Sequence, residues 1–239
     1  MDKFTEDFNF FWSKIENEEN FSFARYADGE VRLMKGLDIN HETQAYKIDK
    51  WKAPNKKTKL GIDLYNTLNH TEDNFYYAIS AINDNINDYS FLIKNIKHNK
   101  NNITFVNLWI NNNYHKMVEK LKNLKREVIL ICNESAKKNS FPFIVKDILH
   151  FPNDCVDFWE ENSEIFLEKM LNKFDKHNNQ LFFISCGPVS EVIIDTLYLK
   201  NPNNTYIDVG SSIDEFVHGY KTRPYMYEYT KYNKHISQF

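Results

Sequence analysis

Arginine, glycine and cysteine are scarce in this chain. Only four of its 30 basic residues are arginine, and its 239 residues include just six glycines and three cysteines. Three cysteines without Cys-x-x-Cys spacing argue against a disulfide scaffold or a thiolate zinc site, and a reducing cytoplasm suits them best. If lysine serves wherever a point charge suffices, the remaining arginines mark places that need a planar, bidentate fork. The few glycines likewise mark backbone positions that exclude a Cβ atom.

Long apolar runs are also absent. No stretch approaches the roughly 20 apolar residues of a membrane-spanning helix, and the acidic, aromatic first residues do not resemble a signal peptide. We therefore expect no transmembrane segment, a cytoplasmic location, and only peripheral contact with any membrane. A formal charge of −3 gives no bulk electrostatic reason to expect a nucleic acid partner. The sequence leaves open whether the chain forms a homo-oligomer.

Short β-rich runs alternate with amphipathic helical patterns along the chain. This alternation predicts an α/β, Rossmann-like fold whose mostly parallel sheet carries helices on both faces. No linker composition divides the sequence, so we predict a single domain over 1–239 with an N-terminal helix at 1–16 and a C-terminal tail at 216–239. The predicted strands are 21–26, 75–80, 103–107, 128–132, 147–151, 181–185 and 206–209. The predicted helices are 4–15, 30–35, 60–68, 88–96, 115–124, 159–174 and 190–199.

The first junction between a strand and a helix carries two carboxylates, Asp28 and Glu30, on either side of Gly29. Ligands of open α/β sheets bind outside the carboxyl ends of the strands, and Mg²⁺ typically takes one or two protein carboxylates together with substrate phosphates. Arg25 and Arg32, two of the four arginines, flank this turn. In the structural alternative, Asp28 is a helix N-cap and Glu30 interacts with the helix dipole. The nearby arginines favour a functional site.

The second junction follows the apolar run 181–185 and reads Cys186-Gly187-Pro188. Proline suits the first position of a helix, and a helix start presents N–H groups that suit a phosphate. The segment contains neither a Walker loop nor the dinucleotide-binding glycine pattern. The structural alternative is a tight turn that packs Cys186 against the core. No histidine at a recognisable spacing supports Cys186 as a nucleophile.

The third junction follows the run 206–209 and places Gly210 between acidic residues. Asp214 lies where it could cap a short helix, with Glu215 directly after it. The tail beyond contains Arg223 among aromatic residues, and it either closes over an anionic ligand or packs on the surface.

A polar segment at 41–59 is the longest stretch without clear periodicity, and it contains Trp51 and Pro54. A loop of that length inside a compact domain is often a lid or a binding loop. The sequence therefore predicts a functional loop here without assigning a role to any of its residues.

Taken in order, the three junctions resemble segments of the bacterial GT-D type glycosyltransferases. Residues 25–30 read Arg-Tyr-Ala-Asp-Gly-Glu where the family has Arg-x-Gly-Asp-Gly-Glu. Gly187-Pro188 and the segment 208–215 resemble the family's closing patterns, Gly-Pro-Thr and Asp-x-Gly-His-x-Asp-x-Glu. The resemblance covers most of the chain, roughly 21–215.

The resemblance implies a Rossmann-like fold and a sugar-nucleotide-dependent transferase. It implies that Asp28 and Glu30 lie at the metal and the nucleotide diphosphate, with Arg25 near the nucleotide. The chain departs from the family pattern in three places: Ala27 stands in place of a glycine, Ser211 in place of a histidine, and Lys137 and Lys138 follow Glu134 where the family tends to have an arginine and a glycine-rich stretch. The family's histidine therefore has no counterpart at that position.

We predict a metal-dependent glycosyltransferase that uses Mn²⁺ or Mg²⁺ and transfers a sugar from a nucleotide-diphosphate sugar, most simply a UDP-sugar, to a glycan or glycoprotein acceptor. The predicted catalytic residues are Asp28, Glu30 and Asp214, of which Asp28 and Glu30 hold the metal. For an inverting transfer Asp214 is the first candidate for the general base, with Glu215 and Asp208 behind it. The residues predicted to bind the donor are Arg25, Gly29, Gly187, Pro188 and Asp208. The alternatives are a metal-dependent nucleotide-sugar hydrolase and a non-catalytic nucleotide-sugar-binding subunit of a glycan assembly complex.

Overall fold

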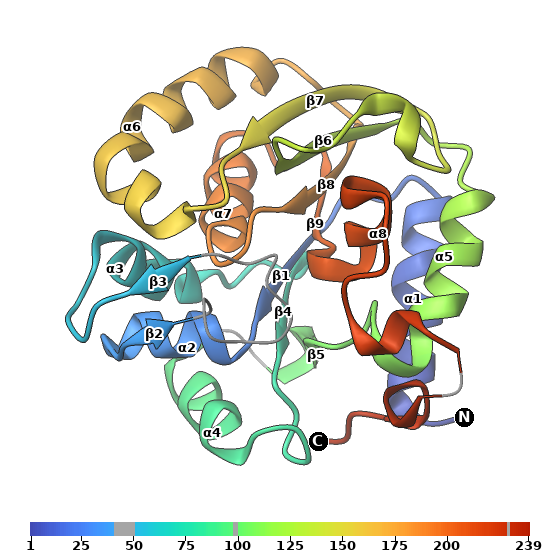
Figure 1. Cartoon of the computed structure of the whole chain (residues 1–239), viewed down its shortest axis with the longest axis horizontal. Helices are drawn as coiled ribbons and strands as arrows, with labels where there is room; N and C mark the ends of the chain where they lie inside the picture. The colour runs from blue at the N-terminus through green and yellow to red at the C-terminus, as the bar shows by residue number, and fades with distance from the viewer. Residues whose placement is uncertain (41–50, 98–99, 229) are drawn as a thin grey trace.

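A seven-stranded sheet forms the centre of the molecule (Figure 1). The computed structural model describes residues 1–40, 51–97, 100–228 and 230–239. The strand order is β5-β4-β1-β9-β8-β6-β7, and every pairing between neighbouring strands is parallel. The strands are β1 Ser22–Tyr26, β4 Phe75–Ile79, β5 Ile103–Phe105, β6 Val128–Asn133, β7 Val145–Phe151, β8 Leu181–Ser185 and β9 Thr205–Asp208.

All of the predicted strands are present, and the α/β, Rossmann-like prediction is confirmed. The central strands are apolar on both faces. In β8, Phe182 and Ile184 point into one apolar core while Leu181 and Phe183 point into the other. Strands of parallel sheets are buried on both faces, so they appear in the sequence as continuous apolar runs. That pattern made their positions predictable.

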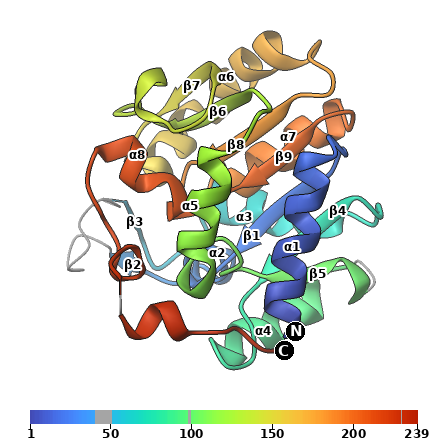
Figure 2. The same cartoon turned by 90° about the vertical axis from the view of Figure 1, so that its right-hand side faces the viewer.

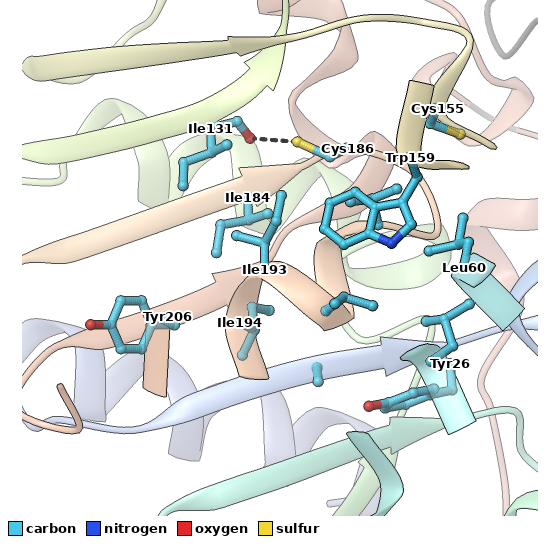
Figure 3. Close-up of a cluster of buried hydrophobic side chains, with 14 of the residues drawn as sticks. Tyr26, Leu60, Ile131, Cys155, Trp159, Ile184, Cys186, Ile193, Ile194 and Tyr206 are labelled. Carbon is cyan, nitrogen blue, oxygen red and sulfur yellow. Dashed lines mark hydrogen bonds between the residues drawn. The ribbon is translucent and has the colours of Figure 1, made fainter. Parts of the chain in front are cut away.

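Helices cover both faces of the sheet (Figures 1 and 2). The helices α1 and α5 pack against one face, and α2, α3, α6 and α7 pack against the other. Figure 3 shows part of the apolar core between the sheet and the helices α2, α3, α6 and α7, where Trp159 of α6 and Ile193 of α7 lie near Ile184 of the sheet. The bounds are α1 Lys3–Glu16, α2 Asp28–Lys35, α3 Lys59–Asn66, α4 Ile86–Asn95, α5 Tyr114–Lys122, α6 Cys155–Phe174, α7 Ser190–Lys200 and α8 Asp214–His218.

Local sequence explains where the first helix begins and which face it buries. The side chain of Asp2 accepts a hydrogen bond from the backbone N–H of Thr5 at 2.9 Å, which caps α1. Aromatic residues recur at helical spacing and face the sheet. The buried residues of α1 are Phe4, Phe8, Phe11, Trp12 and Ile15.

Three details differ from the sequence-based expectation. Helix α6 begins at Cys155, four residues before the predicted start, and β7 begins at Val145. A short antiparallel pair that the sequence did not predict joins β2 Ile39–Asn40 to β3 Lys52–Ala53. Part of the predicted functional loop, 41–50, lies outside the described residues. Across the described ranges, no helix combines the length and the apolarity that a membrane crossing requires.

Candidate active site

A cavity of about 260 Å³ lies at the carboxyl ends of β1, β8 and β9. These three strands are neighbours in the sheet, in the order β1-β9-β8, although β1 is far from the other two in sequence. Parallel strands end at the same edge of a sheet, so the three predicted junctions meet there. Every residue that the sequence analysis assigned to the site lines this cavity: Arg25, Asp28, Gly29, Glu30, Gly187, Pro188, Asp208 and Asp214. Their individual roles stay predictions.

Arg25, at the end of β1, is held rigidly by its neighbours. Its Nε donates to the carbonyl oxygen of Val106 at 2.8 Å, and its guanidinium lies 3.4 Å from Oδ2 of Asp208. Both side chains are nearly buried, with 12% and 6% of their surfaces exposed. Burial raises the pKa of Asp208, and the charge of Arg25 opposes that rise. The pair therefore presents a positioned cation at the cavity wall.

Gly210 is required by the position of Arg25. Its φ of +48° is unfavourable for residues with a side chain, and a Cβ atom placed there would lie only 1.7 Å from a terminal guanidinium nitrogen of Arg25. The backbone N–H of Gly210 also donates to Oδ1 of Asp208 at 2.7 Å. The absence of a side chain at Gly210 therefore leaves the space that the guanidinium of Arg25 occupies.

The two predicted metal ligands occupy the first turn of α2. Asp28 is the first helical residue and is exposed, whereas Glu30 is partly buried. The alternative that made Asp28 the N-cap is wrong, because Ala27 holds that position. The backbone N–H of Ala27 is instead satisfied by Oε2 of Glu30 at 2.7 Å. Glu30 therefore also stabilises the start of the helix.

Burial raises the pKa of Glu30 to about 7, and the negative charges of Asp28 and Asp208 add to the effect. An ionised Glu30 would therefore be stabilised by an additional positive charge in the cavity. Mg²⁺ and Mn²⁺ prefer oxygen ligands, and Mg²⁺ commonly completes its shell with water and substrate phosphates. Within the described ranges, no group of three or more His, Cys, Asp or Glu side chains could hold a metal by itself. The carboxylates of Asp28 and Glu30 therefore fit a divalent cation whose remaining ligands would come from water and a phosphorylated substrate.

The turn between β8 and α7 brings Gly187 and Pro188 to the cavity. The sequence suggested Pro188 as the first residue of the helix. That prediction is wrong, because α7 begins at Ser190. The N–H groups of Val189 and Ser190 donate to carbonyl oxygens of Cys186 and Gly187 within the turn. These two N–H groups are therefore already engaged, and fewer remain for a phosphate than a bare helix start would offer.

Trp51 is a site residue to which the sequence analysis gave no role. Its indole lines the cavity and is only 7% exposed. A Cβ atom on Gly29 would lie 3.3 Å from the indole ring, and one on Gly187 would lie 3.6 Å from Nε1. Both glycines therefore leave space for the tryptophan. An isolated tryptophan in a polar, aperiodic segment was the only available signal.

The segment after β9 encloses the remaining side of the cavity. Asp214 is buried at the start of α8, where its Oδ2 accepts a hydrogen bond from Thr222 Oγ1 at 2.9 Å and lies 3.7 Å from Arg223. Arg223 and Ser211 also line the cavity. Both features predicted for the tail occur, because Arg223 reaches the cavity while Tyr225 is buried and packs against Tyr114. Closure of the tail over an anionic ligand stays a prediction. Glu215 instead accepts a hydrogen bond from the hydroxyl of Tyr114.

Glu191 of α7 is a further residue that the sequence analysis did not identify. Its carboxyl group is fully buried, and its Oε1 accepts a hydrogen bond from the backbone N–H of Arg25 at 3.3 Å. Burial, followed by the charges of Asp208 and Glu30, raises the pKa of Glu191 well above its usual value. A protonated Glu191 can donate to Asp208. Glu191 therefore contacts both members of the ion pair, the backbone of Arg25 and the side chain of Asp208.

Cys186 should be chemically inert, because its thiol is buried and donates to the carbonyl oxygen of Ile131 at 3.3 Å (Figure 3). Burial raises the pKa of Cys186 well above its usual range. All three cysteines are buried. Native protein treated with iodoacetamide at pH 8 should therefore gain no label by intact mass, while unfolded protein gains three. Labelling of Cys186 in the native state would contradict this description.

Two solved structures share this fold. One is a selenomethionine-substituted domain of unknown function 1792, which is 18% identical to this chain, with a TM-score of 0.56. The other, the highly conserved domain of unknown function 1792 with a distinct glycosyltransferase fold, is 17% identical, with a TM-score of 0.57. Each match covers 89% of this chain and 81% of the other. No protein-family model and no curated protein matches the chain. The likeness establishes a Rossmann-like fold of the glycosyltransferase type.

Proposed function

We propose that the chain is a metal-dependent glycosyltransferase of the GT-D type. It transfers a sugar from a nucleotide-diphosphate sugar, with a UDP-sugar as the first candidate, to a glycan or glycoprotein acceptor. One observation carries the proposal: a single cavity, in a fold of the glycosyltransferase type, is lined by two arginines and by the paired carboxylates of α2. Arginines suit a diphosphate, and paired carboxylates suit a divalent cation.

The arginines would bind the diphosphate of the donor. Arg25 is fixed by Val106 and Asp208, so its charge is oriented before substrate arrives. Preorganised positive charge is most effective where negative charge develops during the reaction. Asp28 and Glu30 would hold the cation, which when bound supplies Lewis-acid stabilisation of the leaving diphosphate. Arg223 adds a second cationic side chain to the lining of the cavity.

Asp214 is the group best placed to accept the proton of the acceptor hydroxyl. Its carboxylate lines the cavity and is oriented by Thr222 and Arg223. As the hydroxyl oxygen bonds to the anomeric carbon, the hydroxyl proton passes to the Asp214 carboxylate and the bond from sugar to diphosphate breaks. The fixed neighbours of Asp214 keep it in position for that transfer.

UDP with Mn²⁺ should raise the melting temperature of the protein. Ligand present at 100 times its dissociation constant stabilises a protein by about 2.7 kcal/mol, which corresponds to a rise of about 5–10 °C for a domain of this size. UDP without Mn²⁺ should give a smaller shift, because a cation held by Asp28 and Glu30 would add to the binding of the diphosphate. Differential scanning fluorimetry with a panel of nucleotides measures both shifts.

Other outcomes of this test favour other functions. If no nucleotide shifts the melting temperature with or without Mn²⁺, the glycosyltransferase proposal fails and a scaffold role is favoured. If UDP-sugars are bound and cleaved at a rate that no glycan acceptor changes, the protein is a nucleotide-sugar hydrolase. Transfer itself is measured by release of UDP that depends on both donor and acceptor.

A further inference from the structure

A second, smaller cavity adjoins the one described above. It opens at the carboxyl ends of β6, β7 and β8, on the side of the sheet away from Arg25. The two cavities share four lining residues, so they form two lobes of one cleft. The shared residues are Trp51, Ser185, Gly187 and Asp214.

The two lobes differ in charge. The first lobe is lined by both arginines and by the carboxylates of α2 and β9. Among the described residues that line the second lobe, no lysine or arginine occurs, and the one carboxylate is that of Asp214. A phosphate entering this lobe would meet the carboxylate of Asp214, and among the described lining residues His218 is the one basic side chain. The second lobe therefore suits a phosphorylated group less well than the first lobe, which has two arginines.

Besides Asp214 and His218, the polar side chains of the second lobe include two amides and a hydroxyl. Asn133, the last residue of β6, donates to Oδ1 of Asn153 at 2.6 Å, which links the two amides across the lobe. Asn153 is exposed, and within the described part of the chain its amide nitrogen makes no hydrogen bond. The hydroxyl of Ser185 lies at the boundary between the lobes. Amides and hydroxyls both donate and accept, as the hydroxyl groups of a sugar require.

The apolar part of the wall and the size of the lobe suit one sugar ring. Trp51, Phe151 and Val217 supply the apolar surface. The volume of about 60 Å³ corresponds to roughly four to six water molecules. Such a space accepts part of a monosaccharide and is too small for a whole nucleoside. Apolar walls with a few convergent polar groups are typical of small-molecule sites.

We propose that the second lobe binds an uncharged, hydroxyl-rich sugar ring of the acceptor. Asp214 lies at the boundary of the two lobes, where an acceptor hydroxyl would come between its carboxylate and a donor sugar held in the first lobe. The inference rests on the proposed function, because the term acceptor presupposes transfer. Binding of a neutral glycoside in this lobe can nevertheless be measured without any turnover.

Saturation-transfer difference NMR with methyl β-D-glucopyranoside and methyl β-D-galactopyranoside tests the proposal, with and without UDP and Mg²⁺. At least one of them should give a signal with the natural protein. The Asn133→Ala/Asn153→Ala variant should lower that signal at least fivefold, while the shift in melting temperature produced by UDP and Mg²⁺ stays unchanged. Methyl β-D-glucuronide, whose carboxylate would lie near Asp214, should give a signal several-fold weaker than the neutral glycosides.

Two further variants keep the test interpretable. Asn133 also accepts a hydrogen bond from the backbone N–H of Ser135, so its loss could perturb the turn. Asn153→Ala alone leaves the hydrogen bond between Asn133 and Ser135 in place and should still lower the glycoside signal. Asn172→Ala, at an exposed position near the far end of α6, is the matched control and should change neither signal nor shift.

The outcomes separate the inference from the proposed function. If UDP and Mg²⁺ stabilise the protein but neither neutral glycoside gives a signal, the inference fails and the function stands. If the variants at Asn133 and Asn153 lose UDP binding instead, the lobe belongs to the nucleotide, and the inference is overturned. A stronger signal from the glucuronide would overturn the assignment to uncharged sugars. Absence of any nucleotide effect in the natural protein would count against the proposed function and against the assignment of the bound sugar as an acceptor, while a glycoside signal would still identify the second lobe as a sugar site.

Discussion

Asp28→Asn and Glu30→Gln should each lower the kcat for sugar transfer by at least about 100-fold, equivalent to about 2.7 kcal/mol of transition-state stabilisation. Each variant removes one negative oxygen donor from the α2 turn, so the cation that neutralises the leaving diphosphate would be bound weakly or misplaced. Steady-state release of UDP at several Mn²⁺ concentrations measures the loss. A full return of activity at high Mn²⁺ would assign the residue to metal affinity, and wild-type activity at low Mn²⁺ would refute the metal assignment.

The fold should survive both substitutions. Asp28 is exposed, and a glutamine at position 30 retains a carbonyl oxygen that can accept from the N–H of Ala27. Because burial raises the pKa of Glu30 to about 7, ionised Glu30 destabilises the folded state at higher pH, and Glu30→Gln should leave the melting temperature unchanged or higher there. Asp157→Asn is the matched control, since Asp157 is an exposed acid in the first turn of α6. It should leave kcat unchanged.

Gly210→Ala should weaken donor binding at least tenfold, equivalent to about 1.4 kcal/mol. The new methyl group would collide with the guanidinium of Arg25 and force it away from Asp208. Positive φ at an alanine adds about 1–2 kcal/mol of strain, so the melting temperature should fall by several degrees. Titration of UDP with Mn²⁺ by calorimetry measures the affinity.

A substitution at a second glycine, Gly219, separates backbone strain from displacement of the Arg25 side chain. Gly219 also has positive φ, at +79°, but a Cβ atom there would meet no atom within 4 Å. Gly219→Ala should therefore lower the melting temperature while leaving the affinity for UDP intact. In an Arg25→Ala background, Gly210→Ala should cause little further loss of affinity, because the side chain that it displaces is gone. Equal losses of affinity in the two glycine variants would contradict the proposed displacement.

The secondary structure was largely predictable, because it depends on local pattern. A strand buried on both faces needs a run of apolar residues, and the run at 181–185 became β8 with the predicted bounds. Helix ends were less predictable. Helix α6 begins at Cys155, four residues before the predicted start, whereas α7 begins at Ser190 as its periodicity predicted, although Pro188 had suggested an earlier first turn. Such ends depend on how the preceding turns pack, and no local pattern encodes that packing.

Some residues around the cavity could be recognised from the sequence, and others could not. Scarcity drew attention to Arg25 and Gly29, since a chain with so few arginines and glycines keeps them where their geometry is needed. Glu191 gave no such signal, because one acid in an apolar helix is also typical of an exposed position. Its burial beneath Asp208 follows only from the packing of α7 on β1 and β9.

The sequence by itself determined the strands, most of the helices and the three junctions that carry the candidate chemistry, because each depends on residues close together in the chain. Only the tertiary structure decided which junctions meet. The pairing of β1 with β9 brings Arg25 to Asp208 and Gly210, and the packing of Trp51 against Gly29 and Gly187 joins three separate segments. These contacts span up to 185 positions along the chain, and long-range pairing is set by the burial of whole strands rather than by any local pattern.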